Sequence, residues 1–214
     1  MKQILLATTN PGKIMTFKKI LAKLGYEGVS FADLGLELEE PDETQLTAEE
    51  IAAEKALGYA KQYSDLPVLA RDDTNDIIGV ADEDDPKNHN KAFVASRKGK
   101  YTDELGAEVF AEIAHKYGGE IPCRFNWGYG LAWRDSNDEI KVIHTLVSTD
   151  PKDIKIVDKI SPKKVPGFCF APVMQVNIDG EWKYDSELTD EDSWKAYWSL
   201  QAEGIKSLLD QLED

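Results

Sequence analysis

An apolar run close to the start of the chain leads into a helical pattern. Ile4 to Ala7 is continuously apolar and predicts a short buried strand, which Asn10-Pro11-Gly12 interrupts. Asn10 suits the N-cap and Pro11 the first position of a following helix, which Gly25 ends. The apolar residues at helical spacing are Ile14, Phe17, Leu21 and Leu24. A strand, a tight turn and a helix N-terminus are therefore expected in succession, and such a turn binds anions readily.

A second apolar run, Val68 to Ala70, stops before two adjacent carboxylates, Asp72 and Asp73. A buried strand with paired acids at its carboxyl end is a common way for an α/β sheet to present metal ligands or a general base. An Asp-rich turn after a strand explains the same residues without any function. The segments Thr8–Lys13 and Thr47–Glu50 favour the functional interpretation, because they offer a phosphate-binding lysine and a third carboxylate.

Three more stretches carry the pattern of helices. Thr47 to Tyr63 contains a stripe of small residues that would allow close packing on a sheet. The stripe consists of Ala52, Ala56 and Ala60. Thr102 to Tyr117 has one apolar face, and Thr189 to Leu212 predicts a terminal helix. The polar, turn-rich segment from Ala81 to Asn90 predicts an exposed loop.

Strict alternation dominates the middle of the chain. Pro122 to Trp133 predicts a long strand with an aromatic face, and Ile140 to Val147 returns after a turn at Asp135–Asp138. Val173 to Ile178 and Glu181 to Tyr184 predict a last hairpin. Because strands alternate with helices early and form hairpins late, we expect an α/β fold with an extended mixed sheet flanked by helices.

The composition limits which classes of molecule the protein is expected to bind. The 214 residues carry a formal net charge of -15, which disfavours nonspecific binding to nucleic acid or to an anionic membrane. An anionic substrate would need local lysines or a metal ion to enter. Two cysteines are too few for a disulfide framework, and three histidines fit no metal motif. The N-terminus lacks the apolar content of a signal peptide and no run reaches membrane-spanning length, so the cytoplasm is the expected location.

Four polar residues are candidates for chemistry, and three of them, Lys13, Glu50 and Arg97, have a structural alternative. Lys13 lies in the first turn of a predicted helix, where a cation opposes the helix dipole, and a solvated surface lysine explains it equally well. Glu50 follows Thr47 at the spacing of a capping box. Arg97 belongs to a short basic patch that could touch phosphates or balance charge. Arg124 lies on the face of its strand opposite the aromatic residues.

The motifs resemble, in order, the inosine triphosphate pyrophosphatase family, the HAM1-like pyrophosphatases of non-standard purine nucleoside triphosphates. Ala7 to Lys13 reads A-T-T-N-P-G-K and resembles the phosphate loop A-T-G-N-P-G-K. Thr47 to Ala56 resembles T-F-x-E-N-A-x-x-K-A. Ala70 to Thr74 reads A-R-D-D-T and resembles A-D-D-S-G, with Arg71 as an extra residue. Gly167 to Pro172 resembles G-F-G-Y-D-P.

The resemblance extends over nearly the whole chain and implies the architecture and the reaction. It implies one domain, residues 1–214, with two lobes and an active-site cleft between them, and a homodimer. It also implies cleavage of a nucleoside or deoxynucleoside triphosphate, such as inosine, deoxyinosine or xanthosine triphosphate, to the monophosphate and pyrophosphate. Mg²⁺ would be the cofactor, with Mn²⁺ as a substitute.

The resemblance also implies the roles of individual residues. Glu50 and Asp73 would hold the ion, with Asp72 as a further candidate, and Asp73 or a neighbouring carboxylate would activate the attacking water. Lys55 would offset charge on the leaving pyrophosphate. The residues implied in phosphate binding are Thr8, Asn10, Lys13, Arg97 and Arg124.

The base-recognition end departs from the family pattern. Ala171 stands where G-F-G-Y-D-P has its aspartate, and no Ser-His-Arg follows it. Losing buried groups that read a 6-keto purine should relax or redirect base choice. Aromatic residues or a lysine could contact a base there, although core packing is the alternative for the aromatic ones. These candidates are Phe168, Phe170, Trp194 and Lys195.

Two other functions fit some of these features. A nucleotide-binding sensor or partner-regulating relative with little or no turnover would combine an intact phosphate end with an altered base end. A septum-inhibitor-like nucleotide pyrophosphatase would act on a pyrimidine or a modified base, but the opening loop and the Glu50 segment resemble that family less.

Overall fold

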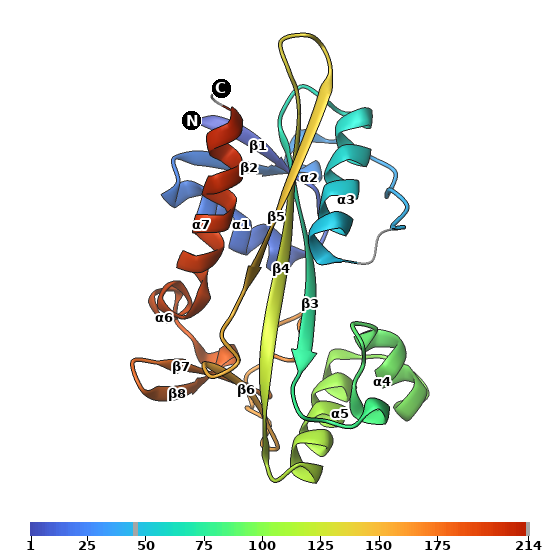
Figure 1. Ribbon diagram of the computed structural model, residues 1–214, viewed down its shortest axis with the longest axis vertical. Coiled ribbons are helices and arrows are strands. Elements are labelled where there is room, and N and C mark those ends of the chain that lie inside the picture. Colours follow the sequence, from blue (N-terminus) through green and yellow to red (C-terminus); the bar gives the residue numbers. More distant parts are fainter. Residues whose placement is uncertain (45–46, 213–214) are drawn as a thin grey trace. The chain divides into compact units, whose positions relative to one another are not determined.

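The computed structural model describes residues 1–44 and 47–212, and the chain divides into two compact units. Unit 1 comprises Met1–Asp73, Asn126–Val147 and Ser199–Asp214, and unit 2 comprises Thr74–Phe125 and Ser148–Trp198. In the described part of the chain, the strand order is β2-β1-β3-β4-β6-β7-β8, with β5 beside β4 (Figure 1). The fold is thus the expected mixed α/β type. The single domain with a cleft between two lobes stays a prediction.

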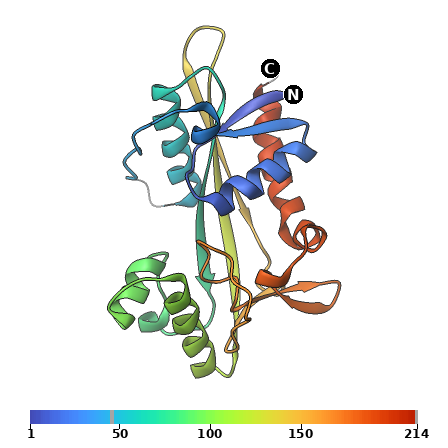
Figure 2. The ribbon, with the colours of Figure 1, turned by 180° about the vertical axis from the view of Figure 1, so that it is seen from behind.

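Parallel strands form the N-terminal sheet of unit 1. β1 (Lys2–Leu6) pairs with β2 (Tyr26–Ser30) and with the start of β3 (Val68–Ile77), so that Leu5 lies opposite Val29 and Val68. The second half of β4 (Glu120–Arg134) and most of β5 (Ile140–Ser148) complete the strands of this unit. Its helices are α1 (Pro11–Lys23), α2 (Phe31–Leu34), α3 (Ala48–Gln62) and α7 (Ser199–Leu209). Figure 2 shows α1, in blue, lying over β1 and β2.

Glycines let α3 pack directly on β4. A Cβ atom on Gly128 would lie 2.1 Å from the carbonyl carbon of Ala48, and one on Gly130 would lie 2.3 Å from the carbonyl oxygen of Ala52. Ala52 and Ala56 are fully buried, as the stripe of small residues predicted. The helix and the strand therefore approach backbone to backbone, which fixes the position of α3 side chains relative to the sheet.

Antiparallel strands and two helices form unit 2. The first half of β4 pairs with β6 (Ile154–Val157), which pairs with β7 (Met174–Ile178), and β8 (Glu181–Tyr184) is the outermost strand of this order. Its helices are α4 (Asn90–Lys98), α5 (Asp103–Lys116) and the short α6 (Asp190–Ser193). Single 3₁₀ turns occupy Asp82–Asp84 and Asp185–Glu187. None of the helices within residues 1–44 and 47–212 is long and apolar enough to cross a membrane.

The structure corrects one predicted element and adds detail to another. β3 does not stop before the acids but continues to Ile77, because Asp72 and Asp73 find partners within the fold instead of forming a turn. The terminal helix is interrupted: α6 leads into a π-helical segment, Trp194–Trp198, before α7, and a 3₁₀ turn, Asp210–Leu212, follows. Two elements were not predicted: helix α4, which carries the basic residues Arg97 and Lys98, and strand β6.

Candidate functional site

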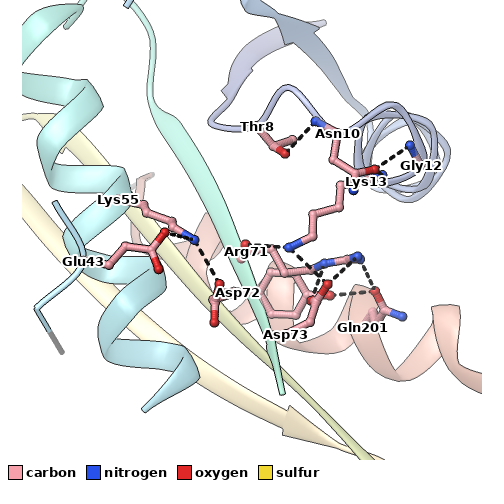
Figure 3. A network of polar contacts seen from close by, with 11 residues as sticks. Thr8, Asn10, Gly12, Lys13, Glu43, Lys55, Arg71, Asp72, Asp73 and Gln201 are labelled. Atoms are coloured by element: carbon pink, nitrogen blue, oxygen red, sulfur yellow. Dashed lines mark hydrogen bonds and ion pairs between the residues drawn. The ribbon is translucent and has the colours of Figure 1, made fainter. Parts of the chain in front are cut away.

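The loop between β1 and α1 is shaped by its own polar side chains. Oδ1 of Asn10 accepts hydrogen bonds from the backbone N–H groups of Gly12, at 2.9 Å, and Lys13, at 3.2 Å. The hydroxyl of Thr8 accepts one from the N–H of Asn10 at 3.1 Å. The predicted N-cap at Asn10 is confirmed. These contacts fix the start of α1, and the Lys13 side chain extends from it toward β3 (Figure 3).

Asp72 and Asp73 lie on opposite faces of β3. The strand continues through both residues, and successive side chains of a strand point to opposite sides. The Asp72 carboxylate contacts Lys55 of α3, whereas the Asp73 carboxylate contacts Lys13 of α1 (Figure 3). The carboxylates that looked like one acidic pair in the sequence therefore belong to two separate clusters.

The Asp73 cluster consists of Lys13, Arg71 and Asp73. Nε of Arg71 lies 2.7 Å from Oδ1 of Asp73, and Nη2 of Arg71 donates to Oδ2 at 3.1 Å. Nζ of Lys13 lies 3.1 Å from the same Oδ2. Burial raises the pKa of Asp73, but the charges of Arg71 and Lys13 outweigh it and hold that pKa below its ordinary value. Both carboxylate oxygens are therefore ionic partners of cations.

Buried residues of other elements also contact the Arg71 side chain. Nη1 of Arg71 donates to Oε1 of Gln201 at 3.3 Å, and the hydroxyl of Tyr129 donates to the same oxygen at 2.7 Å. The guanidinium carbon lies 5.7 Å from the centre of the Phe17 ring. Gln201 is 2% exposed and Tyr129 is fully buried. Strand β3 is thereby tied to α1, β4 and α7 at a single side chain.

The opposite face of β3 carries the Lys55 cluster, which consists of Glu43, Lys55 and Asp72. Nζ of Lys55 lies 2.8 Å from Oε1 of Glu43 and 2.9 Å from Oδ1 of Asp72. Burial lowers the pKa of Lys55, but the hydrogen bonds and charges of Glu43 and Asp72 outweigh it and raise that pKa above its ordinary value. Lys55 is therefore a permanent cation between two carboxylates.

Thr47 caps α3, and Glu50 contacts the cap. The hydroxyl of Thr47 donates to Oε2 of Glu50 at 3.0 Å and accepts from its backbone N–H at 3.4 Å. The Thr47 half of the predicted capping box is therefore present, while the Glu50 carboxylate accepts from the Thr47 hydroxyl and not from its backbone N–H. Within residues 1–44 and 47–212, no three His, Cys, Asp or Glu side chains come together as a metal site. The predicted metal role of Glu50 and Asp73 therefore stays a prediction.

The two arginines proposed for phosphate binding lie in unit 2 and have acidic partners. Nη2 of Arg97 lies 2.9 Å from Oδ1 of Asp84, and its guanidinium carbon lies 4.4 Å from the centre of the Phe93 ring. Nη1 of Arg124 lies 3.9 Å from Oδ2 of Asp76. Arg97 therefore connects α4 to the buried carboxylate of Asp84. The side chain of Arg124 is 44% exposed, and its ion pair with Asp76 is long.

The two phenylalanines of the Gly167–Pro172 loop have different environments. Phe170 is 3% exposed and packs 4.2 Å from Phe110, centre to centre, so core packing accounts for it. Phe168 lines a pocket of about 350 Å³ within unit 2, between α5 and residues 160–172. Its other lining residues include Ala107, Ile160, Val165, Pro166 and Cys169. Phe168 is therefore the aromatic candidate for contact with a ligand.

Two candidates for contact with the base, Trp194 and Lys195, lie on the π-helical segment. Trp194 is partly buried, and Lys195 is exposed with Nζ 3.5 Å from Oε1 of Glu191 and 3.7 Å from Oδ2 of Asp179. π-Helical turns are rare and often mark functional sites. The base-reading role of these two residues stays a prediction.

Sequence reasoning missed Arg71, Gln201 and Glu43 as members of the charged clusters. A signal existed for Arg71, since strand alternation places it on the same face as Asp73. Gln201 is 130 positions away from Arg71 in the chain, and no local pattern joins them. Glu43 lies between helices in a loop, its side chain is 42% exposed, and no local pattern joins it to Lys55.

Comparisons with known proteins show which proteins this chain resembles in sequence. The chain is 30% identical over 202 residues to the dITP/XTP pyrophosphatase of Brucella melitensis, covering 90% of this chain and 83% of that relative. It is 28% identical over 213 residues to the dITP/XTP pyrophosphatase of Thermus thermophilus, covering 99% and 92%. The family model described as the Ham1 family matches residues 4–77.

Solved structures show the same fold. The Ham1 protein of Staphylococcus aureus matches with a TM-score of 0.63 at 22% identity, over 100% of both chains. A HAM1 protein from Coxiella burnetii matches with a TM-score of 0.63 at 21% identity, over 99% of this chain and 100% of that one. The fold is therefore that of the Ham1 proteins. The chain belongs to the Ham1 family.

Proposed function

We propose that the chain is a nucleoside triphosphate pyrophosphohydrolase. Water would replace pyrophosphate on the α-phosphorus of the substrate and leave a nucleoside monophosphate. The observation that carries this proposal is the convergence of two helix lysines, Lys13 and Lys55, on the carboxylates of one strand. Relatives named dITP/XTP pyrophosphatases support a non-standard purine triphosphate as the substrate class.

The phosphate end would rely on Lys13. Its ammonium lies beside Asp73 and 3.3 Å from the backbone carbonyl oxygen of Arg71, at the start of a helix whose first turn has no acid. Cations positioned before the reaction stabilise charge that develops on a leaving pyrophosphate. In a protein with a net charge of -15, such local positive charge is what admits an anion.

The carboxylates differ in how well they suit a divalent cation. Mg²⁺ prefers carboxylate oxygens, keeps several waters and, when bound, offsets phosphate charge and acidifies a bound water. Both oxygens of Asp73 already contact cations, so Asp73 fits an ion poorly. In the described part of the chain, Asp72 has a protein partner at Oδ1 and Glu50 has one at Oε2. Each retains a second oxygen, so we assign the metal role, for Mg²⁺ or Mn²⁺, to Asp72 and Glu50.

Base choice would differ from that of the relatives. Ala171 is fully buried at the position of the family's aspartate. A buried hydrogen-bonding group discriminates strongly between bases, and a methyl group in its place removes that discrimination. Phe168, in its pocket, offers an aromatic surface instead. A homodimer and a cytoplasmic location are proposed on the family resemblance.

A nucleotide panel tests the proposed reaction. Purified protein with Mg²⁺ would be given standard, deaminated and modified-base triphosphates in ribo and deoxy forms, with pyrophosphate and orthophosphate measured separately. We expect pyrophosphate from one or a few nucleotides, and none from Glu50→Gln, whose circular dichroism should match the wild type. Nucleotide binding without product would support the sensor instead, and full activity in Glu50→Gln would remove Glu50 from the metal site.

A further inference from the structure

The Arg71 side chain is mostly buried, and its contacts are with other residues of the protein. The side chain is 11% exposed, Nη2 donates to Asp73 and Nη1 to Gln201, and Nε lies 2.7 Å from Oδ1 of Asp73. Neither the resemblance nor the proposed reaction gives this arginine a role. It is nevertheless the residue that separates this chain's A-R-D-D-T from the A-D-D-S-G pattern.

The charge of the Asp73 cluster depends on Arg71. Lys13 and Arg71 contribute two positive charges and Asp73 one negative charge, so one positive charge is left for an anion. Without the guanidinium, Lys13 and Asp73 would form a neutral pair. A lysine that is paired one to one with a nearby carboxylate attracts phosphate much less than one with a net positive surrounding.

The geometry suits a permanent partner of Asp73. The guanidinium lies close to both carboxylate oxygens: Nη2 donates a hydrogen bond to Oδ2, and Nε lies 2.7 Å from Oδ1 as an ion-pair contact without hydrogen-bond geometry. Gln201 and the ring of Phe17 hold it in that orientation. Asp73 therefore keeps its bond to Arg71 whether or not the Lys13 ammonium moves toward a ligand.

We propose that Arg71 is a positioning residue that occupies the Asp73 carboxylate, so that Lys13 presents a net positive charge to the polyphosphate of the substrate. The inference deepens the proposed function and rests on it. The ligand class is a polyphosphate anion, for which inorganic pyrophosphate is the simplest probe. The Asp73 carboxylate is then the ionic partner of Arg71 and Lys13 and not a ligand of the metal.

Charge-balancing variants test the proposal. Calorimetric titration would measure the affinity for inorganic pyrophosphate in Arg71→Met, Asp73→Asn and the double variant, and steady-state kinetics would give KM and kcat. We expect Arg71→Met to weaken pyrophosphate binding and raise KM by about tenfold, with kcat changed by less than about threefold. Adding Asp73→Asn should restore both values to within about threefold of the wild type.

Matched controls separate charge from folding. Arg134→Met also removes a strand arginine paired with an aspartate, since Nη1 of Arg134 lies 3.1 Å from Oδ1 of Asp138, and it should change neither value. If Arg71→Met does not fold, Arg71→Lys keeps the positive charge and loses part of the contact with Asp73, so its affinity for pyrophosphate should fall by less than about tenfold. Three results would overturn the proposal. They are a double variant that binds pyrophosphate as weakly as Arg71→Met, an Arg71→Met variant that loses kcat with KM unchanged, and weaker pyrophosphate binding in Asp73→Asn.

The titration also distinguishes this proposal from the proposed reaction. Pyrophosphate binding requires no turnover, so it can fail while the wild type still releases pyrophosphate from nucleotides. In that case Arg71 has no role in charge balance, and the pyrophosphohydrolase function stands. If the wild type binds pyrophosphate but turns over no nucleotide, the charge relation holds and the reaction is wrong.

Discussion

The two faces of β3 carry opposite charge balances, although their acids are neighbours in sequence. The Asp73 cluster has two cations around one carboxylate, and the Lys55 cluster has two carboxylates around one cation. Strand alternation separates Asp72 from Asp73, and α1 and α3 bring one lysine to each face. A positive cluster suits phosphate and an acidic cluster suits a divalent cation. One strand can thus contribute to both phosphate binding and the binding of a divalent cation.

The clusters also differ in what supports them. Buried Gln201 and Tyr129 hold the Asp73 cluster through Arg71. The Lys55 cluster includes Glu43, whose side chain is 42% exposed and comes from a loop. Rearrangement on binding a cation therefore requires less disruption on the Asp72 side, because an exposed ion pair is weaker than a buried network.

The largest expected effect on activity comes from Lys55→Met. Its loss leaves the carboxylates of Glu43 and Asp72 without their cation, so phosphate is repelled from that face. We expect kcat/KM for the best nucleotide of the panel to fall by at least about 100-fold. Lys141→Met is the matched control, since Lys141 also bridges two acids, Glu139 and Asp135, and it should stay within about twofold of the wild type. Equal losses in both variants would show a general charge effect.

A smaller effect, confined to one face, is expected from Gly130→Ala. The new Cβ would lie 2.3 Å from the Ala52 carbonyl oxygen, so α3 must move away from β4. We expect a destabilisation of about 3 kcal/mol in urea unfolding and a weaker Lys55–Asp72 contact. Binding of inorganic pyrophosphate to Lys13 should change little. Unaltered stability would mean that the close approach of α3 to β4 is not required.

The smallest effect on activity is expected from Asp84→Asn, which alters a carboxylate of unit 2. Hydrogen bonding from Lys116 outweighs burial and, with Arg97 and Tyr117, lowers the pKa of Asp84 to about 2. Its contribution to stability is therefore complete above the ordinary aspartate pKa and is lost as pH falls toward 2. At pH 7, urea unfolding of Asp84→Asn should give a free energy of unfolding about 3 kcal/mol below that of the wild type. This difference in stability should shrink below about pH 4. A difference that does not depend on pH would contradict this origin.

Much of the fold could be predicted from local patterns, and the charged clusters only in part. The small-residue stripe of α3, the N-cap at Asn10 and the long alternating strand β4 follow from periodicity and capping, and all are present. The length of β3 was missed because Asp, Thr and Asn are turn residues by local preference. Their tertiary partners, Lys13 and Lys55, override that preference in the folded chain.

The division between the clusters required the structure. Alternation alone indicates that Asp72 and Asp73 diverge, but not which lysine each contacts. The bond between Arg71 and Gln201 joins β3 to α7 across 130 positions, and a single sequence contains no signal for it. For the same reason, the sequence could not decide which phenylalanine is available to contact the base. Phe168 and Phe170 are equally hydrophobic, and only the packing shows that Phe168 lines a pocket whereas Phe170 lies in the core.

Manganese binding tests the division between the two faces most directly. Mn²⁺ can replace Mg²⁺, and its electron paramagnetic resonance signal reports the free ion in solutions of wild type, Asp72→Asn and Asp73→Asn. We expect Asp72→Asn to weaken Mn²⁺ binding by at least about tenfold, and Asp73→Asn to leave it within about threefold, because Arg71 and Lys13 already occupy the Asp73 carboxylate. The reverse ranking would place the ion on the Asp73 face and contradict the account.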